Sequence, residues 1–286
     1  MTNFLEVSNL SKSFKSFALK DISFTLPKGY IMGLIGPNGS GKTTTIKLIL
    51  NMMKREGGEV KIMELDNCAD ENAVKSKLGV VFDSNCFCDD WTVSRTERSV
   101  SVFYKNWNSG KFSRLLGRFG IERKKKVKEL SKGMQMKLML ACAFSYDAKL
   151  LILDEPTSGL DPVSRDELLG ILSEYIEDGE HSVLFSTHIT ADLERAADYI
   201  TYINGGELFY SGSKDDFVNM YCIAKGGREE LSPEQSRKTV GLRKFSTGFE
   251  ALIKTDDMRL FSNLSIEPAT IDDIVVFTNQ KGALYE

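Results

Sequence analysis

The stretch that most constrains the fold is "GPNGSGKTT", which runs from Gly36 to Thr44. It fits the phosphate-binding loop pattern, in which a glycine and four further residues precede Gly-Lys-Thr. The apolar run "YIMGLIG" leads into the loop, and a helical pattern from Lys42 to Met53 follows it. Glycines allow backbone amides to wrap around phosphates at the positive end of that helix. The sequence therefore predicts a nucleotide-binding α/β unit with the order strand, loop, helix.

The parts of this loop have separate expected roles. Lys42 is predicted to reach the β and γ phosphates, and the Thr43 hydroxyl is predicted to ligate Mg²⁺. The flanking strand and helix disfavour the alternative, a glycine turn with an incidental lysine. The expected nucleotide-binding residues of the loop are Gly36, Pro37, Asn38, Gly39, Ser40, Gly41, Lys42, Thr43 and Thr44.

A second segment, "LLILDEPTSGLD", ends a short apolar run with two acidic residues, Asp154 and Glu155. Adjacent acids at the end of a strand are usually surface charge. A buried parallel strand would instead bring them to the sheet edge where the phosphate-binding loop lies. We therefore expect Asp154 to hold the magnesium shell and Glu155 to polarise an attacking water.

His188 follows the apolar run "HSVLFST" and is expected at the same sheet edge. A lone histidine at a strand end is more often a structural or exposed residue. Because the chain has only two histidines and this one follows a strand of the buried type, we expect it to hydrogen-bond the γ-phosphate or the water.

A serine and a glycine open the amphipathic run "ELSKGMQMKLML", from Glu129 to Leu140. The first amides of a helix are unpaired and its N-terminal end is positive, so this place suits an anion. By itself the pattern would indicate an ordinary serine N-cap. In a chain that already carries a phosphate-binding loop, it indicates a second phosphate site.

Composition limits the partners. The 286 residues are 42% hydrophobic and 27% charged with a formal net charge of -3, so a nucleic-acid partner is not expected.

The five cysteines are an odd number, and Cys86-Phe87-Cys88 lacks the spacing of a zinc site; we expect reduced thiols in a cytosolic protein. The N-terminus has no apolar core of signal-peptide length, and no window of about 18 apolar residues occurs. Any membrane span is therefore expected in another chain.

The order of patterns along the chain predicts the organisation. Strand-like and helix-like runs alternate around the acidic segment, which indicates a mostly parallel sheet. Residues 86–148 read as a helical insertion. After about Lys214 the sequence becomes polar and glycine-bearing, and "GFEALIKT" and "DDIVVFT" indicate a few strands with a helix. The predicted domains are residues 1–218 and a small accessory domain, residues 219–286.

Four ordered motifs, "GPNGSGKTT", "LSKGM", "LILDEPTSGLD" and "STH", resemble the nucleotide-binding subunit of an ABC (ATP-binding cassette) transporter over roughly residues 2–215. The resemblance implies a phosphate-loop NTPase cassette, with a mostly parallel sheet, an antiparallel β subdomain and a helical subdomain, followed by a small C-terminal α+β domain. It also implies an ATPase that binds ATP and Mg²⁺, dimerises on them and drives a separate integral membrane permease.

Further residue roles come from this resemblance alone. Ser131 and Gly133 would bind the γ-phosphate held on the loop of a second subunit, either a copy of this chain or a paralogue. The segment Ser158 to Asp161 would pass signals across the dimer. Phe14 would stack on adenine; Phe17 is the competing candidate, and either ring could be simple core.

The sequence departs from the commonest family pattern at two places. In "LSKGM", Lys132 and Met134 stand where the family's commonest form has glycine and glutamine, and this variant resembles bacterial cassettes that pair with ABC-2 type, exporter-like permeases. The tail "IEPATIDDIVVFT" resembles the C-terminal ends of such ATPases, and "GLRKFSTGFEAL" resembles cassettes encoded beside GntR-type regulators in Gram-positive bacteria. Asp83 stands where a glutamine usually links the metal site to the permease, so Asp83 is a candidate near Mg²⁺.

These features together predict a cytoplasmic ATPase that is held at the inner face of the membrane by its permease and serves export. One rival is a soluble cassette ATPase acting on nucleic acid or ribosomes, disfavoured by the single cassette and the slightly acidic charge. A second rival is the ATPase of an importer, which differs only in its partner. Substrate contacts would lie in the permease, so the sequence does not name the substrate.

Overall fold

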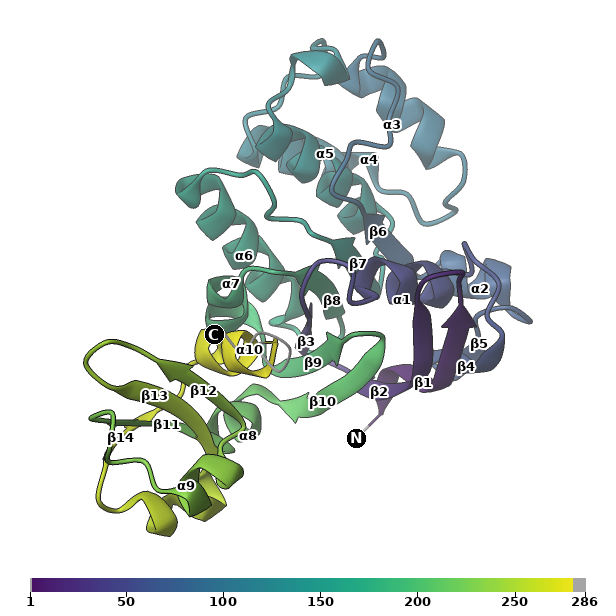
Figure 1. Ribbon diagram of the computed structural model, residues 1–286. Helices are drawn as coiled ribbons and strands as arrows, with labels where there is room; N and C mark the ends of the chain where they lie inside the picture. Colours follow the sequence, from purple (N-terminus) through teal and green to yellow (C-terminus); the bar gives the residue numbers. More distant parts are fainter. Residues whose placement is uncertain (1, 280–286) are drawn as a thin grey trace. The chain divides into compact units, whose positions relative to one another are not determined.

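The structure of the protein, a computed structural model, describes residues 2–279 (Figure 1). The chain divides into two compact units, Met1–Ser211 and Gly212–Glu286. The second unit begins just before a short helix, α8 (Lys214–Asn219), whereas the domain boundary expected from composition was after residue 218. Each unit has its own sheet.

The first unit is built on a ten-stranded sheet with the order β5-β4-β1-β2-β10-β9-β3-β8-β7-β6. Its parallel part is the run β9-β3-β8-β7-β6. Every residue of β3, β7 and β8 is buried, as expected for apolar parallel strands covered on both faces. The parallel strands are β3 (Ile31–Ile35), β6 (Leu78–Val81), β7 (Leu150–Asp154), β8 (Ser182–Thr187) and β9 (Tyr199–Asn204).

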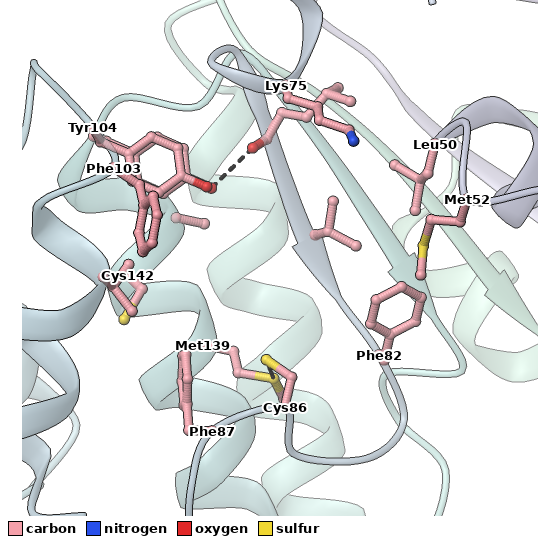
Figure 2. Close-up of a pocket in the computed structure, with 15 residues that line it drawn as sticks. Leu50, Met52, Lys75, Phe82, Cys86, Phe87, Phe103, Tyr104, Met139 and Cys142 are labelled. Carbon is pink, nitrogen blue, oxygen red and sulfur yellow. Dashed lines mark hydrogen bonds between the residues drawn. The ribbon is translucent and has the colours of Figure 1, made fainter. Parts of the chain in front are cut away.

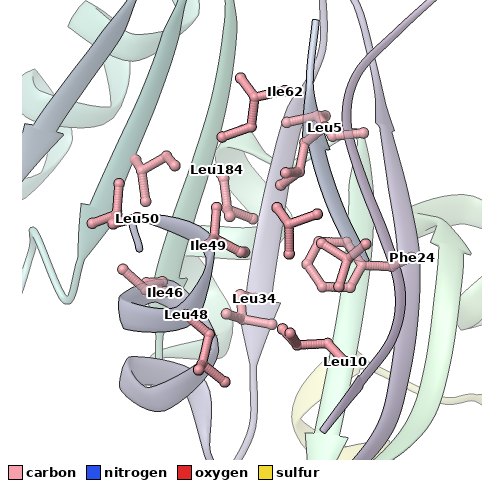
Figure 3. Packing of buried hydrophobic residues seen from close by; sticks show 14 of the residues in the cluster. Leu5, Leu10, Phe24, Leu34, Ile46, Leu48, Ile49, Leu50, Ile62 and Leu184 are labelled. Atoms are coloured by element: carbon pink, nitrogen blue, oxygen red, sulfur yellow. The ribbon is translucent and has the colours of Figure 1, made fainter. Parts of the chain in front are cut away.

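Beyond this run, β10 pairs with β2 in parallel, and the sheet continues with the antiparallel pairs β2–β1, β1–β4 and β4–β5. Helix α1 (Lys42–Ile49) packs between the two parts, and Figure 3 shows its leucine and isoleucine side chains facing Leu5, Leu10 and Phe24. This core fixes the start of α1, and with it the loop before α1. The remaining strands of the sheet are β1 (Asn3–Ser13), β2 (Ala18–Pro27), β4 (Gly57–Ile62), β5 (Leu65–Asp66) and β10 (Glu207–Ser213).

A helical region lies beyond the edge strand β6 (Figure 1). Thr92 and Asn108 cap its first two helices through their side-chain oxygens, which satisfies amides that the helix leaves unpaired. Its helices are α3 (Val93–Ser101), α4 (Ser109–Arg118) and α5 (Lys132–Ser145), with a short 3₁₀ turn at Val127–Glu129. The other helices of the unit are α2 (Glu71–Lys75), α6 (Pro162–Ile176) and α7 (Thr190–Ala196).

The second unit is a small α+β domain with an antiparallel sheet of order β12-β13-β11-β14. "GFEALIKT" contains strand β13, and "DDIVVFT" lies in helix α10. The fold class expected from the sequence is confirmed for both units. The elements are β11 (Tyr221–Gly226), α9 (Pro233–Lys238), β12 (Gly241–Lys244), β13 (Phe249–Lys254), a 3₁₀ helix at Thr255–Phe261, β14 (Ser265–Pro268) and α10 (Ile271–Asn279). Nowhere in residues 2–279 is there a helix with the length and apolarity needed to cross a membrane.

Candidate active site

A cavity of about 690 Å³ opens at the carboxyl ends of the parallel strands, where ligands bind in open α/β sheets. Sequence positions more than a hundred residues apart meet there, because β3, β7 and β8 are neighbours in the sheet. The lining residues are Ser16, Phe17, Asn38, Gly39, Gly41, Lys42, Thr43, Thr44, Asp83, Glu155, Ser158 and His188.

In the loop before α1, the backbone passes so close to neighbouring residues that there is no room for side chains at some positions. A side chain at Gly36 would collide with the Ile203 carbonyl, and one at Gly41 would press on Leu19 and Phe17. Gly39 has φ +81° and Gly41 has φ +112°, a region that glycine occupies without strain. The glycines are therefore required by the turn, and they leave the amides at the start of α1 facing the cavity.

Lys42 is buried, with 6% of its surface exposed, yet its ammonium lies in a polar cradle. The Nζ donates to the Gly36 carbonyl at 2.8 Å and lies 3.4 Å from that of Pro37. Glu155 Oε1 is 3.5 Å from the same Nζ. A buried ammonium with these partners is held at the loop, where it can contact a phosphate.

Asp154 ends strand β7 and is buried. Its Oδ1 accepts from the Ser186 hydroxyl at 2.6 Å and from the Thr43 hydroxyl at 3.2 Å. One carboxylate and one hydroxyl beside a phosphate-binding loop are the oxygen donors that Mg²⁺ uses together with phosphates and water. No group of three or more metal-binding His, Cys, Asp or Glu side chains occurs in residues 2–279, and a magnesium ion bound mainly through phosphates needs none.

Glu155 stands next to Asp154 in an unusual backbone conformation, with φ +49°. Its amide donates to the Ser186 hydroxyl at 2.9 Å, and its carbonyl accepts from the Ser158 amide at 3.1 Å. The carboxylate lies 2.7 Å from His188 Nδ1 through Oε2. Glu155, His188 and Lys42 thus form one polar cluster that faces the cavity.

Ser186 and Asp192 support this cluster, and sequence reasoning did not single them out. Ser186 is paired with Asp154 in the β7–β8 register. Asp192, which is 1% exposed, accepts from Thr157 at 2.6 Å and from Thr187 at 3.3 Å. The sequence does show an acidic residue, Asp192, in the first turn of the helix after His188. Its hydrogen-bond partners could be found only once the strand order was known.

Ser131 and Gly133 do not line the cavity. Ser131 caps α5 by accepting from the Met134 amide at 3.2 Å. A side chain at Gly133 would contact Ser164 and Leu160, and one at Gly159 would come within 3.2 Å of Lys132 Nζ. The "LSKGM" segment therefore lies against the "SGLD" segment of its own chain.

The predicted aromatic, Phe14, is 42% exposed and is not among the lining residues, whereas Phe17 is. Their ring centroids are 6.2 Å apart. Asp83 also lines the cavity. Within residues 2–279 its side chain has no hydrogen bond to the turn that follows it.

A second cavity, of about 460 Å³, lies beyond the Asp83 loop and is mainly apolar. Figure 2 shows Phe82, Cys86, Phe87 and Met139 around it. Phe103 at its rim is 81% exposed. All five cysteines are free, and burial raises the pKa of the Cys86 thiol, which makes this sulfur less reactive.

The fold and the site together define a phosphate-loop ATPase of the cassette type. Residues 19–158 match the family described as ABC transporter. The chain is 30% identical to the ABC-type transporter ATP-binding protein EcsA of Bacillus subtilis, over 83% of this chain and 98% of that protein. It therefore belongs to the ABC transporter family, as an ATP-binding subunit.

Two further comparisons agree. The chain is 30% identical to the lantibiotic transport ATP-binding protein SrtF of Streptococcus pyogenes, over 76% of this chain and 93% of that protein. A solved ATP-binding subunit of an ABC transporter matches with TM-score 0.68 and 30% identity, over 74% of this chain and 91% of that chain. ABC ATP-binding subunits bind nucleotide, dimerise and act with membrane permeases, so this chain is an ATPase coupled to transport.

Proposed function

We propose that this chain hydrolyses Mg-ATP at the cavity between the phosphate-binding loop and Glu155, and that hydrolysis drives an export permease. The observation that carries the proposal is the cluster of Lys42, Glu155 and His188 at the end of the parallel sheet, with Asp154 and Thr43 beside it. These groups come from three separate segments, and phosphoryl transfer needs each type.

The residues have distinct roles in this proposal. The loop amides and Lys42 hold the β and γ phosphates and stabilise the charge that develops on them. Glu155 accepts a proton from the attacking water, and His188 orients that carboxylate or contacts the γ-phosphate. When bound, Mg²⁺ would neutralise phosphate charge, with Thr43 and Asp154 as its protein ligands. Ser186 holds both acids in place, because its hydroxyl accepts from the Glu155 amide and donates to the Asp154 carboxylate.

The adenine contact is proposed for Phe17 or Phe14. The cavity lining favours Phe17, whereas family resemblance favours Phe14. Leucine at the stacking position should weaken the affinity for ATP by about 0.5–1.5 kcal/mol, the range for an aromatic pair. Equilibrium dialysis with ATP, comparing Phe14→Leu and Phe17→Leu, separates the two: only the stacking residue should change the dissociation constant.

A second subunit completes each site in this proposal. Ser131 and Gly133 lie outside the cavity of their own chain, which supports a role at the γ-phosphate of a partner, and the amides that begin α5 suit an anion. The partner is a second copy of this chain or a paralogous ATPase subunit. Lys132 Nζ lies 3.2 Å from the position that a Cβ at residue 159 would occupy, which places this segment beside "SGLD", the segment proposed to carry signals across the dimer.

The permease is proposed to dock near the Asp83 loop. Apolar residues with exposed surface, including Phe103 and Met52, surround the cavity next to that loop, and large exposed apolar patches mark interaction surfaces. Docking there would place the chain at the cytoplasmic face of the membrane, with Asp83 between the partner and the metal.

Export is proposed from similarity to SrtF, whose name describes lantibiotic transport, and from the "LSKGM" form of the signature. The test is co-purification of the chain with its membrane partner, followed by reconstitution in vesicles with the ATPase outside. ATP-dependent uptake of the cargo into such inside-out vesicles supports export. Cargo loss from preloaded vesicles would identify an importer.

A further inference from the structure

The second unit contains a cavity of about 630 Å³ that has no part in the ATPase chemistry. It lies among the loop after β11, the short helix α9, and the hairpin that joins β12 to β13. Its volume falls within the range of small-molecule sites. Both apolar and polar groups line it, so it is a candidate for a ligand that has both kinds of surface.

The charged side chains that line this cavity are all positive. Its only charged lining residues are Arg228 and Lys244. Neither of them forms an ion pair with any residue of the described chain, 2–279. Two cations without acidic partners, facing one cavity, attract an anion. The lining hydroxyls of Ser236 and Ser246 add donors beside them.

One wall of the cavity is aromatic. Phe245 is 41% exposed and Phe249 is buried, and both line the cavity with Leu231. An exposed phenylalanine ring beside a cation offers a flat apolar surface to a planar group. The cavity therefore combines an anion-binding part with a surface for a ring.

The backbone holds these groups in place. Arg228 Nε donates to the Phe245 carbonyl at 3.1 Å, and the Phe245 amide donates to the Gly248 carbonyl at 2.8 Å. A side chain at Gly248 would collide with the Gly226 carbonyl, so the hairpin and the end of β11 are in close contact. The first bond uses one donor of the guanidinium and leaves its NH₂ groups for a ligand.

The strand register separates Lys244 from its basic neighbour Arg243. Lys244 pairs with Phe249, and Arg243 pairs with Glu250. Because successive side chains point to opposite faces, Lys244 shares the face of Phe249. Arg243 lies on the other face, with its guanidinium 5.0 Å from the Phe277 ring. The chain thus supplies a matched control residue one position away.

We propose that this cavity binds a small organic anion, a planar ring that bears a phosphate or carboxylate group. Arg228 and Lys244 bind the anionic group, and the ring packs on Phe245. This site lies within the second unit and is distinct from the nucleotide cavity of the first.

The first experiment uses phenyl phosphate as the probe and the full-length protein with excess Mg-ADP, which occupies the nucleotide cavity. Saturation-transfer NMR should detect binding with a dissociation constant of about 1 mM or below. Benzyl alcohol carries only the ring and inorganic phosphate only the anionic group, so each should bind at least about tenfold more weakly. Phosphate has no observable protons, so its affinity is measured by its competition with the phenyl phosphate signal. Benzoate distinguishes a site that accepts either anion from one that requires phosphate.

Variants then locate the site. Arg228→Ala and Lys244→Gln should each raise the dissociation constant of phenyl phosphate about tenfold, the loss expected for a charge-assisted hydrogen bond. Arg243→Ala should leave it unchanged, and the thermal unfolding of each variant checks its fold. Lys244 is exposed and unpaired in the described chain, so Lys244→Gln keeps the test valid should Arg228→Ala fail to fold. Absence of binding at about 10 mM probe, equal binding of inorganic phosphate, or equal loss in Arg243→Ala would each overturn the proposal.

Discussion

Glu155 combines a demanding backbone conformation with the best-placed carboxylate of the site. A residue other than glycine at φ +49° costs of order 1 kcal/mol or more. The bonds of its amide to Ser186 and of its carbonyl to the Ser158 amide stabilise this conformation. Strain at a residue that touches both Lys42 and His188 is a reason to place Glu155 at the centre of the chemistry.

Glu155→Gln should therefore lower ATP turnover by about 100-fold or more while it preserves ATP binding, because the amide keeps the shape but cannot accept the proton. Because the bound ATP is not hydrolysed, the dimer should persist, and size-exclusion chromatography with Mg-ATP should detect it. Glu177→Gln, at the end of α6, is the matched control and should behave as the native chain. A native hydrolysis rate in Glu155→Gln would remove Glu155 from the role of base.

Asp83 offers a second prediction at a single residue. A carboxylate about 5 Å from Mg²⁺, at an effective dielectric near 20, gains roughly 3 kcal/mol per unit of metal charge before desolvation is subtracted. Asp83→Asn should thus raise the magnesium concentration for half-maximal ATPase activity, and Asp83→Ala should also weaken stimulation by the permease. Asp89→Asn, in the same loop but outside the cavity lining, is the control. Unchanged magnesium dependence in both Asp83 variants would make this residue part of the turn only.

The loop residues could be predicted from sequence because their chemistry is local: nine consecutive positions specify the turn and the start of α1. Ser186 and Asp192 could not, because their roles depend on β8 lying beside β7. "DDIVVFT" shows the ambiguity of a short apolar run. Ile271, Ile274, Phe277 and Thr278 are the buried positions of α10, a helical spacing that becomes clear only when the run is extended by one residue at its start.

At the scale of elements, the start of α5 caps its own helix, and we propose that it also acts in the nucleotide site of a partner subunit. Ser131 caps the helix, so a bulky replacement also removes a cap worth about 1 kcal/mol. Aspartate caps helices as well as serine does, but its charge would repel a γ-phosphate. This difference separates the local role from the proposed role across the dimer.

Ser131→Asp should accordingly keep the thermal stability of the isolated chain and its nucleotide affinity, yet abolish dimerisation on Mg-ATP. Ser131→Arg should abolish dimerisation too. When Ser131→Arg is mixed with Lys42→Ala, one composite site regains Lys42 from the first chain and Ser131 from the second, so partial ATPase activity should return. Normal dimerisation of Ser131→Asp would reduce Ser131 to a helix cap, and an inactive mixture would contradict the shared site.

At the scale of the whole molecule, the parallel sheet has different polar clusters at its two ends. Glu155 and His188 follow β7 and β8, whereas Asp147 and His181 precede them. His181 is 7% exposed and lies between two carboxylates, 3.2 Å from Asp147 and 2.9 Å from Asp178. This second cluster is remote from the nucleotide, so its contribution is to stability.

The pKa values at this end give the direction of a pH effect. Burial raises the pKa of Asp147, but hydrogen bonds from Lys149 and His181 outweigh it, so the pKa lies below its ordinary value of 3.8. Burial likewise opposes the bonds from the Glu180 amide and His181 at Asp178, whose pKa is also lowered. Carboxyls with a lower pKa in the folded chain stabilise it above the unfolded value, and this stability is lost as pH falls through the folded value.

Urea unfolding should therefore show the first unit losing stability as the pH falls from about 5 to below 4. Asp147→Asn should lower the free energy of unfolding at pH 7 by about 0.5–1.5 kcal/mol. The stability of this variant should also fall less steeply with decreasing pH, because it lacks one of the carboxyls whose pKa is lowered in the folded chain. Asparagine suits this position because Asp147 has φ +59°, a conformation that asparagine tolerates.

Both tryptophans, Trp91 and Trp107, belong to the first unit, so their fluorescence reports its unfolding without interference from the second. Asp272→Asn, an acid of the second unit, should leave this tryptophan transition unchanged at every pH. An equally steep acid loss in Asp147→Asn and the native chain would show that the cluster does not govern acid stability.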